Sequence, residues 1–429
     1  WEGVLKADSY GPMSPQGSML GFGAGNQDGT DNNCQNLNIW TPGLNDGGLR
    51  PVLVWLHGGG FSTGTANDSS YDGEALAKNG DVVVVSVNHR LNVFGYLDLS
   101  AYDEKYKDSA NVGMWDIIAA LEWIQQNIEV FGGDPDNVTV FGQSGGGAKV
   151  LGLMSTPYAV GLFHKGIVES GVTETVGVNF TSQEASTRLA ENLLAELNIA
   201  PENIEQLQIV AVDKLQSAAT KALDATAQEF QIPAPLTDGY QMEWEPVVDG
   251  DFLPTSPVTE TNFADAGQDI PLLIGSNLNE WTGFYRTSTD GVDTDALSAA
   301  LKTAYPDKTD LTADHVDTLI RLPILKTMSH KADQNGAPVY AYLLTYGSSN
   351  HGAEIPYIFR HSDVSAMNDL FSSIWVNFAR SGVPSADSLP TWEPYTREGG
   401  ATMLLDTTSQ LVYHHDAALL KLLAPDYEY

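Results

Sequence analysis

One serine of the chain stands in a setting that suits a catalytic nucleophile. Gly142-Gln-Ser-Gly-Gly146 fits the pattern G-x-S-x-G and lies between an apolar β-rich run (138–141) and an apolar helical stretch (150–154). At a sharp strand-to-helix turn a serine projects its hydroxyl above the sheet, and the flanking positions must lack side chains. The alternative is an ordinary turn with a capping serine, but each glycine that opens a helix costs roughly 1 kcal/mol in helix propensity. The pattern therefore favours Ser144 as a nucleophile.

A second glycine-rich motif could stabilise negative charge on a substrate oxygen. His57-Gly-Gly-Gly-Phe61 directly follows an apolar run that ends at Leu56. Consecutive glycines let backbone N–H groups approach a substrate closely, and with the N–H of Gly145 they could hold the oxyanion of a tetrahedral intermediate. The alternative is a flexible loop, which the position directly after a strand and upstream of the serine motif disfavours.

These motifs lie among alternating strand and helix patterns. Ile117, Leu121 and Ile124 recur at helical spacing, and Gly132 and Gly133 then stop the helix. Strand, helix and strand in this order predict an α/β protein with a doubly wound sheet. The near-continuous apolar runs that predict buried parallel strands are residues 51–56, 81–87, 138–141, 166–170, 271–275 and 339–344.

The ordered motifs together resemble the type-B carboxylesterase (cholinesterase-like) family. The resemblance covers nearly the whole chain and implies an α/β-hydrolase fold, with a mostly parallel central sheet and helices on both faces. It predicts one domain over residues 1–429, with helical excursions near 181–235 and 287–335. The motifs that carry it are His57–Phe61, Asn88-His-Arg-Leu91, Phe131-Gly-Gly-Asp-Pro135, Gly142–Gly146, Val248-Asp-Gly250, Gly275-Ser-Asn with Glu280, His351-Gly-Ala-Glu-Ile-Pro-Tyr357, Trp375-Val-Asn-Phe-Ala-Arg380 and Trp392-Glu-Pro394.

The resemblance also implies a catalytic triad in the order serine, acid, histidine. Matched motif by motif, the triad falls on Ser144, Glu280 and His351. In physical terms His351 would deprotonate Ser144, and Glu280 would orient the imidazole ring and stabilise its charged form. Related hydrolases also use aspartate as the acid, so Asp249 and Asp251, which lie in a predicted turn, remain alternatives.

Five further residues are assigned around this triad by the resemblance. Gly59, Gly60 and Gly145 match the family's oxyanion hole, and Ser170 matches a serine that supports the acid. Two of the positions depart from the family. Gln143 stands where a glutamate is common, which removes a carboxylate beside the nucleophile, and Gly145 replaces a common alanine, which is expected to loosen the turn.

Other departures lie near the start of the chain. Cys34 matches a cysteine that many family members pair, but Ser14 occupies the partner position, so that bridge is expected to be absent. The segment between them lacks the tryptophan with which cholinesterases hold choline, and Phe22 is its only aromatic residue. Family members extend some tens of residues before the position of Trp1, so a family N-terminal segment is expected to be missing.

Composition restricts the class of protein. Among 429 residues, 55 are acidic and 21 basic, for a net charge of −34, which disfavours nucleic acid and anionic membranes as partners. A single cysteine excludes an intramolecular disulfide and a cysteine-based metal site. No apolar run approaches the roughly 18 residues of a spanning helix, so we expect a soluble protein, secreted or cytoplasmic, of open oligomeric state.

The sequence therefore predicts a serine carboxylic-ester hydrolase that acts on a small-molecule ester through an acyl-enzyme, without metal or cofactor. An acyltransferase or amidase with the same triad stays open. So does a non-catalytic cholinesterase-like binding module, although the retention of all three triad residues disfavours it.

Overall fold

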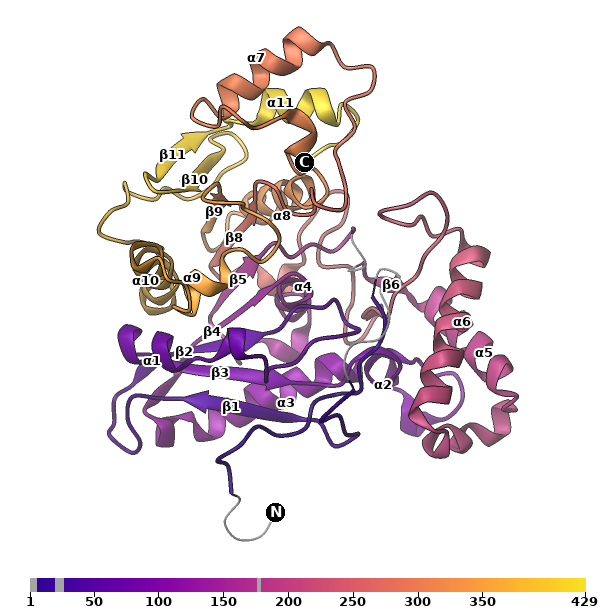
Figure 1. Cartoon of the computed structure of the whole chain (residues 1–429). Coiled ribbons are helices and arrows are strands. Elements are labelled where there is room, and N and C mark those ends of the chain that lie inside the picture. Colours follow the sequence, from indigo (N-terminus) through magenta and orange to yellow (C-terminus); the bar gives the residue numbers. More distant parts are fainter. Residues whose placement is uncertain (1–5, 20–26, 176–178) are drawn as a thin grey trace.

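A nine-stranded sheet forms the centre of the molecule (Figure 1). The computed structural model describes residues 6–19, 27–175 and 179–429. The strand order is β1-β3-β2-β4-β5-β8-β9-β10-β11, and the pairs from β3 to β10 run parallel. The strands are β1 (Asn36–Trp40), β2 (Arg50–Leu56), β3 (Val83–Asn88), β4 (Gly133–Gln143), β5 (Lys165–Glu169), β8 (Leu272–Asn277), β9 (Val339–Leu344), β10 (Ala401–Leu405) and β11 (Gln410–Tyr413).

The inner strands are buried on both faces. Every residue of β3, β8 and β9 is buried, as are the valines and leucines of β2. Side chains that alternate between two covered faces are mostly apolar, which is why these strands read as hydrophobic runs, with polar residues such as Asn88 and Asn277 at their carboxyl ends. The six predicted runs correspond to β2, β3, β4, β5, β8 and β9.

The outer strands have a different pairing. β1 runs antiparallel to β3, with Asn36 opposite Asn88, and β11 runs antiparallel to β10. All five residues of β1 are only partly buried, so this strand lacks the long apolar run that marks an inner strand. A separate two-stranded parallel sheet joins β6 (Thr181–Ser182) to β7 (Val247–Val248).

Helices cover both faces of the sheet, in agreement with the predicted fold class (Figure 1). On one face lie α3 (Val112–Asn127), α4 (Gly145–Leu153) and α8 (Arg321–Asp333). On the other lie α1 (Glu74–Gly80) and α10 (Ser365–Ser381), with the short α9 (Ile355–Ile358) packed on α10. The chain leaves the end of α3 through Gly132, whose φ of +72° is a left-handed conformation that glycine adopts without strain.

The two stretches predicted as helical excursions differ in their relation to the sheet. α5 (Gln183–Leu197) and α6 (Val212–Phe230) pack against each other beside the sheet, near α2 (Asn92–Tyr96) (Figure 1). In the second stretch α7 (Thr294–Ala304) packs on α11 (Ala417–Leu423). α8, in contrast, packs on β8 and β9, and most of its residues are buried. Within the predicted stretch 287–335, only the part before α8 therefore leaves the sheet.

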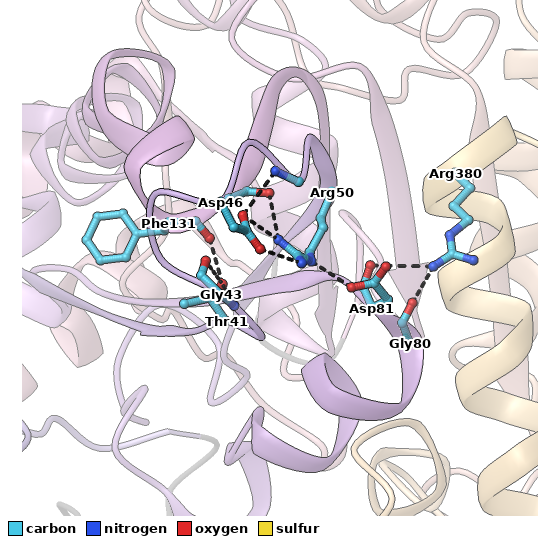
Figure 2. Close-up of polar contacts among 10 residues, drawn as sticks. Thr41, Gly43, Asp46, Arg50, Gly80, Asp81, Phe131 and Arg380 are labelled. Carbon is cyan, nitrogen blue, oxygen red and sulfur yellow. Dashed lines mark hydrogen bonds and ion pairs between the residues drawn. The ribbon is translucent and has the colours of Figure 1, made fainter.

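A polar network ties together the loops at the amino ends of the parallel strands (Figure 2). Arg50, which begins β2, bonds Asp46 at 2.7 Å and Asp81 at 2.6 Å. Arg380 of α10 donates to the carbonyl oxygens of Gly80 and Asp81. Because Ser144 follows the carboxyl end of β4, this network stabilises the end of the sheet opposite to the serine motif.

The start of the chain is described only in part. Cys34 is fully buried, and the Ser14 hydroxyl hydrogen-bonds its thiol, whose pKa is raised mainly by burial. Before β1, residues 6–19 and 27–35 contain no strand, and Met13 forms an isolated bridge with Thr30. Phe22, predicted as the only aromatic residue between Ser14 and Cys34, lies outside the described residues. No helix in the described part of the chain has the length and apolar character to cross a membrane.

Candidate active site

Ser144 lies at the turn between β4 and α4 in a strained backbone conformation. Its φ and ψ are +58° and −124°, a region that residues other than glycine rarely adopt. The Ser144 N–H donates to the carbonyl of Glu169 on β5 at 2.8 Å, which fixes the turn. A carbon added at Gly142 would lie 2.6 Å from the carbonyl carbon of Gly146, closer than real contacts allow. The flanking glycines are therefore required by the close approach of α4 to β4.

Three backbone N–H groups near Ser144 lack an acceptor. Those of Gly59, Gly60 and Gly145 make no hydrogen bond to any residue that the structure describes. A carbon added at Gly58 would lie 3.4 Å from the Ser144 Cβ, so the glycine loop passes directly beside the serine. Unpaired backbone N–H groups are rare in protein interiors, and here they could donate to a developing oxyanion.

Gly145 has a different role from the one that the sequence analysis expected. Instead of loosening the turn, it permits close packing against the glycine loop. A carbon added at Gly145 would lie 2.5 Å from the Cα and 2.6 Å from the N of Gly60. The absent side chain therefore lets two elements that carry free N–H groups touch each other.

Glu280 accepts three hydrogen bonds just beyond the carboxyl end of β8. The donors are Ser170 Oγ at 2.6 Å, the Asn277 N–H at 2.7 Å and His351 Nδ1 at 2.6 Å. The His351 N–H also donates to the Glu280 carbonyl oxygen at 3.0 Å. Glu280 is buried, and a buried carboxylate without water requires such donors.

The His351 ring is held on one side and free on the other. Its Nε2 is buried and has no partner among the described residues, so no hydrogen bond to Ser144 is formed in this state. The next residue, Gly352, lies beside the serine turn, because a carbon added there would be 3.6 Å from Gln143 Nε2. Hydrogen bonds between catalytic groups are often long before substrate binds. Trp281 stacks on the imidazole, with ring centroids 4.6 Å apart and an interplanar angle of 30°.

Buried acids surround the Glu280–His351 pair. Burial alone would lower the pKa of His351, but the charge and hydrogen bond of Glu280 raise it above its usual value. Burial, followed by the charge of Glu280, raises the pKa of Asp317 and of Glu354. Both shifts favour the neutral form of Asp317 and Glu354.

A buried carboxyl group from the neighbouring strand lies beside Gln143. Gln143 on β4 is the register partner of Glu169 on β5. Glu169 is fully buried and accepts a hydrogen bond from Trp375 Nε1 at 2.7 Å. Burial, with the charge of Glu354, raises the pKa of Glu169 well above its usual range, which favours the neutral form.

The two alternative acids lie in a different environment. Asp249 accepts hydrogen bonds from Asn111 Nδ2 at 2.9 Å and from the N–H groups of Asp251 and Leu253. Asp251 accepts from Tyr158 OH at 3.0 Å. Both form a turn, as the sequence predicted, and it is Glu280 that contacts His351.

Sequence analysis missed three residues next to the site. Lys149, on α4, contacts the glycine loop; Trp281 contacts the triad histidine; and Glu354 accepts from Asn277 at 2.6 Å. Their positions in the sequence were a signal, because each lies within a few residues of a predicted site residue. Their roles depend on contacts across the fold, which the spacing does not show. In the described ranges, no cluster of three or more His, Cys, Asp or Glu side chains is arranged to hold a metal ion.

Comparison with known proteins gives a consistent result. Residues 1–420 match the model of the carboxylesterase family. The chain is 33% identical to the para-nitrobenzyl esterase of Bacillus subtilis (strain 168), over 95% of this chain and 86% of that protein. It is 31% identical to the liver carboxylesterase of Sus scrofa, over 93% and 80% respectively. A solved esterase from anaerobic Clostridium hathewayi, which can hydrolyze aliphatic aromatic polyesters, superposes with a TM-score of 0.85 at 32% identity, covering 99% of this chain and 90% of that one.

Proposed function

The chain belongs to the carboxylesterase family and is a serine carboxylic-ester hydrolase, and we propose that Ser144, His351 and Glu280 are its catalytic triad. The observation that carries this proposal is the chain of hydrogen bonds from Ser170 through Glu280 to His351, which leaves only Nε2 of the imidazole available. An imidazole held by a carboxylate at Nδ1 has its free nitrogen in the form that accepts a proton.

In the first half-reaction His351 Nε2 takes the hydroxyl proton of Ser144 while Oγ attacks the ester carbonyl carbon. The carbonyl electron pair moves onto oxygen, and the resulting oxyanion accepts hydrogen bonds from the N–H groups of Gly59, Gly60 and Gly145. Collapse of this intermediate breaks the bond to the alcohol oxygen, which receives the proton from His351. The acyl group remains as an ester on Ser144.

The second half-reaction repeats the same steps with water. A water molecule gives a proton to His351 while its oxygen attacks the acyl carbon, and the oxyanion forms again in the same place. Collapse breaks the bond to Ser144 Oγ, which takes the proton back. The net change is ester plus water to acid plus alcohol, and Glu280 stays ionised throughout while it stabilises the imidazolium.

The nucleophile is tested by substitution and labelling. Ser144→Ala is expected to abolish hydrolysis of p-nitrophenyl acetate and covalent labelling by a fluorophosphonate, with the fold unchanged by circular dichroism. Ser155→Ala is a matched control, because Ser155 is buried just beyond α4 and only donates to the Leu151 carbonyl at 2.7 Å. Labelling of another serine, located by mass spectrometry, would contradict the assignment. Product analysis with an added alcohol separates hydrolysis from acyl transfer.

The substrate class we propose is an ester with an aromatic group near the scissile bond. Trp281 is only half-buried where it stacks on His351, and Phe284, 75% exposed, lies 6.1 Å from Trp281 between ring centroids. Aromatic surface this close to the reacting groups favours an aromatic partner by about 0.5–1.5 kcal/mol beyond area burial. Two relatives, a para-nitrobenzyl esterase and an esterase that can hydrolyze aliphatic aromatic polyesters, support the same class.

A pair of substrates tests this preference without relying on absolute rates. The ratio of kcat/KM for a benzyl ester to that for the cyclohexylmethyl ester of the same acid is expected to be about 2–10. Trp281→Leu should bring the ratio toward 1, whereas Tyr413→Leu, at an exposed aromatic on β11, should leave it unchanged. A ratio that stays the same in Trp281→Leu would refute the aromatic contact.

A further inference from the structure

Lys149 is a fully buried lysine without a charged partner. It lies on α4, in the helix that begins directly after Ser144, and its side chain has no exposed surface. Among the described residues it forms no ion pair. Burial lowers its pKa to about 7, which shows how costly the ammonium is at this place. An apolar side chain would fill the space at lower cost, so the specific contacts of the ammonium require an explanation.

The contacts of Lys149 match the three N–H groups of an ammonium. Nζ donates to the carbonyl oxygen of Gly60 at 2.7 Å and to that of His57 at 3.1 Å. It also lies 5.0 Å from the centroid of the Phe61 ring, within the range of a cation–π contact. All three partners belong to the segment His57–Phe61, the glycine loop that carries two of the free N–H groups.

Every carbonyl of the glycine loop is held by a donor. Lys149 holds those of His57 and Gly60, the His57 ring contacts the Gly58 oxygen at 2.8 Å, and the Thr63 N–H donates to the Gly59 oxygen at 3.0 Å. A peptide group is planar and trans, so fixing the direction of a carbonyl also fixes the N–H of the following residue on the opposite side. The His57 ring and the Thr63 N–H therefore direct the N–H groups of Gly59 and Gly60, and Lys149 fixes the peptide groups on either side of them. Glycines cannot fix their own dihedral angles, so these donors must do so.

We propose that Lys149 is a positioning residue of the oxyanion hole, whose ammonium fixes the two ends of the glycine loop so that its free N–H groups face the reacting carbonyl. The inference rests on the proposed function, because it takes the N–H groups of Gly59 and Gly60 as the oxyanion donors. The inference depends most on the hydrogen bond from Lys149 Nζ to the Gly60 oxygen, because Gly60 also packs against Gly145 on the same helix as Lys149. One side chain therefore sets the loop and the helix in register.

The surroundings of Lys149 suit this role. His57 and His89 stack beside it, with ring centroids 4.9 Å apart and 5° between the planes. Burial and then the charge of Lys149 lower the pKa of His57 to about 3 and that of His89 well below its usual value. Both shifts favour the neutral form of these rings, so neither imidazole competes in charge with the Lys149 ammonium beside the loop.

The test separates positioning of the donors from general stability. Lys149→Met keeps the length and removes the donors, and it is expected to lower kcat for p-nitrophenyl acetate by about 10–100-fold with KM changed less than about twofold. An aryl trifluoromethyl ketone, which adds to the serine as an oxyanion, should lose affinity by the same factor. The matching methyl ketone, used where little covalent adduct forms, measures binding in the ground state. Its affinity for Lys149→Met should equal its affinity for the wild-type protein.

Lys331→Met is a matched control. Lys331 is also fully buried, and its Nζ donates to two backbone carbonyls, of Gln268 at 2.8 Å and Ala337 at 3.4 Å, away from the site. Its substitution should lower the melting temperature without changing kcat or the affinity of the trifluoromethyl ketone. If Lys149→Met behaves in the same way, with stability lost but kcat and ketone affinity kept, the positioning role is wrong.

A second variant keeps the proposal testable if Lys149→Met does not fold. Lys149→Gln retains two N–H donors on a shorter side chain and should lower kcat relative to the wild-type protein, with ketone affinity falling by the same factor. Unchanged kcat and ketone affinity in this variant would overturn the inference. Failure of the underlying catalytic assignment is distinguishable, because the wild-type protein would then form no ketone adduct at Ser144.

Discussion

Gly145→Ala is the substitution for which the structure gives the most specific expectation. The added carbon would lie 2.5 Å from Gly60 Cα and 2.6 Å from Gly60 N, and it would also meet the Gly60 oxygen. These are backbone atoms, so no side-chain rotation relieves the contact. Because real Cβ contacts below 3.0 Å essentially never occur, the glycine loop must move by about 0.5 Å or more. That movement would also stretch the bond from Lys149 to the Gly60 oxygen.

The expected loss can be worked out from this displacement. Removing one oxyanion donor typically costs about 10²–10³ in kcat, and a misplacement of about 1 Å near reacting groups can cost about 10². Because the shift moves the N–H of Gly60 away from that of Gly145, we expect kcat/KM to fall by about 10²-fold, or about 2.7 kcal/mol of transition-state stabilisation. Overpacking should also destabilise the fold by about 1–3 kcal/mol.

The assay is kcat/KM for p-nitrophenyl acetate together with the melting temperature. Gly152→Ala, on the same helix, is the control, because its added carbon meets only the end of the Met114 side chain, at 3.0 Å, and the Phe180 ring. This control should keep activity within about twofold. If Gly145→Ala retains kcat/KM within about threefold of wild type, the glycine loop yields without loss of its donors and the reasoning is refuted.

Three further outcomes follow from charge and burial. Burial lowers the pKa of His351, but the charge and hydrogen bond of Glu280, together with the charges of Glu354 and Asp317, raise it above its usual value overall. Because His351 must be neutral to act, kcat/KM should fall with decreasing pH around a midpoint above 6.5. Glu280→Gln should move this midpoint to lower pH and reduce kcat by about 10⁴-fold, and an unmoved midpoint would contradict the pairing. Arg321→Met should cost about 3–5 kcal/mol in urea unfolding, because it leaves the buried Asp416 carboxylate, 2.8 Å from Arg321 Nε, unpaired. Burial alone would raise the pKa of Asp416, but the charge of Arg321 lowers it from 3.8 to about 2. The stability that this ion pair contributes is therefore complete above pH 3.8 and is lost as pH falls through about 2. Equal costs of Arg321→Met at pH 7 and at pH 2 would contradict this contribution. Finally, the net charge of −34 should repel anionic esters, so added salt should raise kcat/KM for a succinate half-ester but not for a neutral one; equal salt responses would argue against this repulsion.

Much of the fold could be predicted from the sequence because its signals are local. The inner strands are marked by continuous apolar runs, and α3 by the spacing of Ile117, Leu121 and Ile124, all of which are buried. The outer strands β1, β10 and β11 were not predicted. β1 and β11, which pair antiparallel with their neighbours, are at most partly buried and have a weak apolar pattern. β10 is mostly buried and pairs parallel with β9, but it is short, and its assignment depends on the strands it pairs with.

The sequence by itself determined the requirements of the serine turn and the family-like order of motifs. The backbone conformation at the serine turn and at the loop His57–Phe61 requires glycine, as at Gly142 and Gly146. Such a local requirement is visible in the residues of the motif itself. Only the tertiary structure decided which acid contacts His351, because Glu280 and His351 are far apart in the chain and the choice against Asp249 depends on where β8 ends.

The same reason explains Lys149, whose position just after the serine motif placed it near the site but did not show its role. Its partners lie on another loop, and only the packing of α4 against the end of β2 brings its ammonium to their carbonyl oxygens. The stacking of Trp281 on His351 likewise joins two loops. A contact between distant segments is fixed by the register of the sheet and the packing of helices on it, and neither can be read from the residues around one motif.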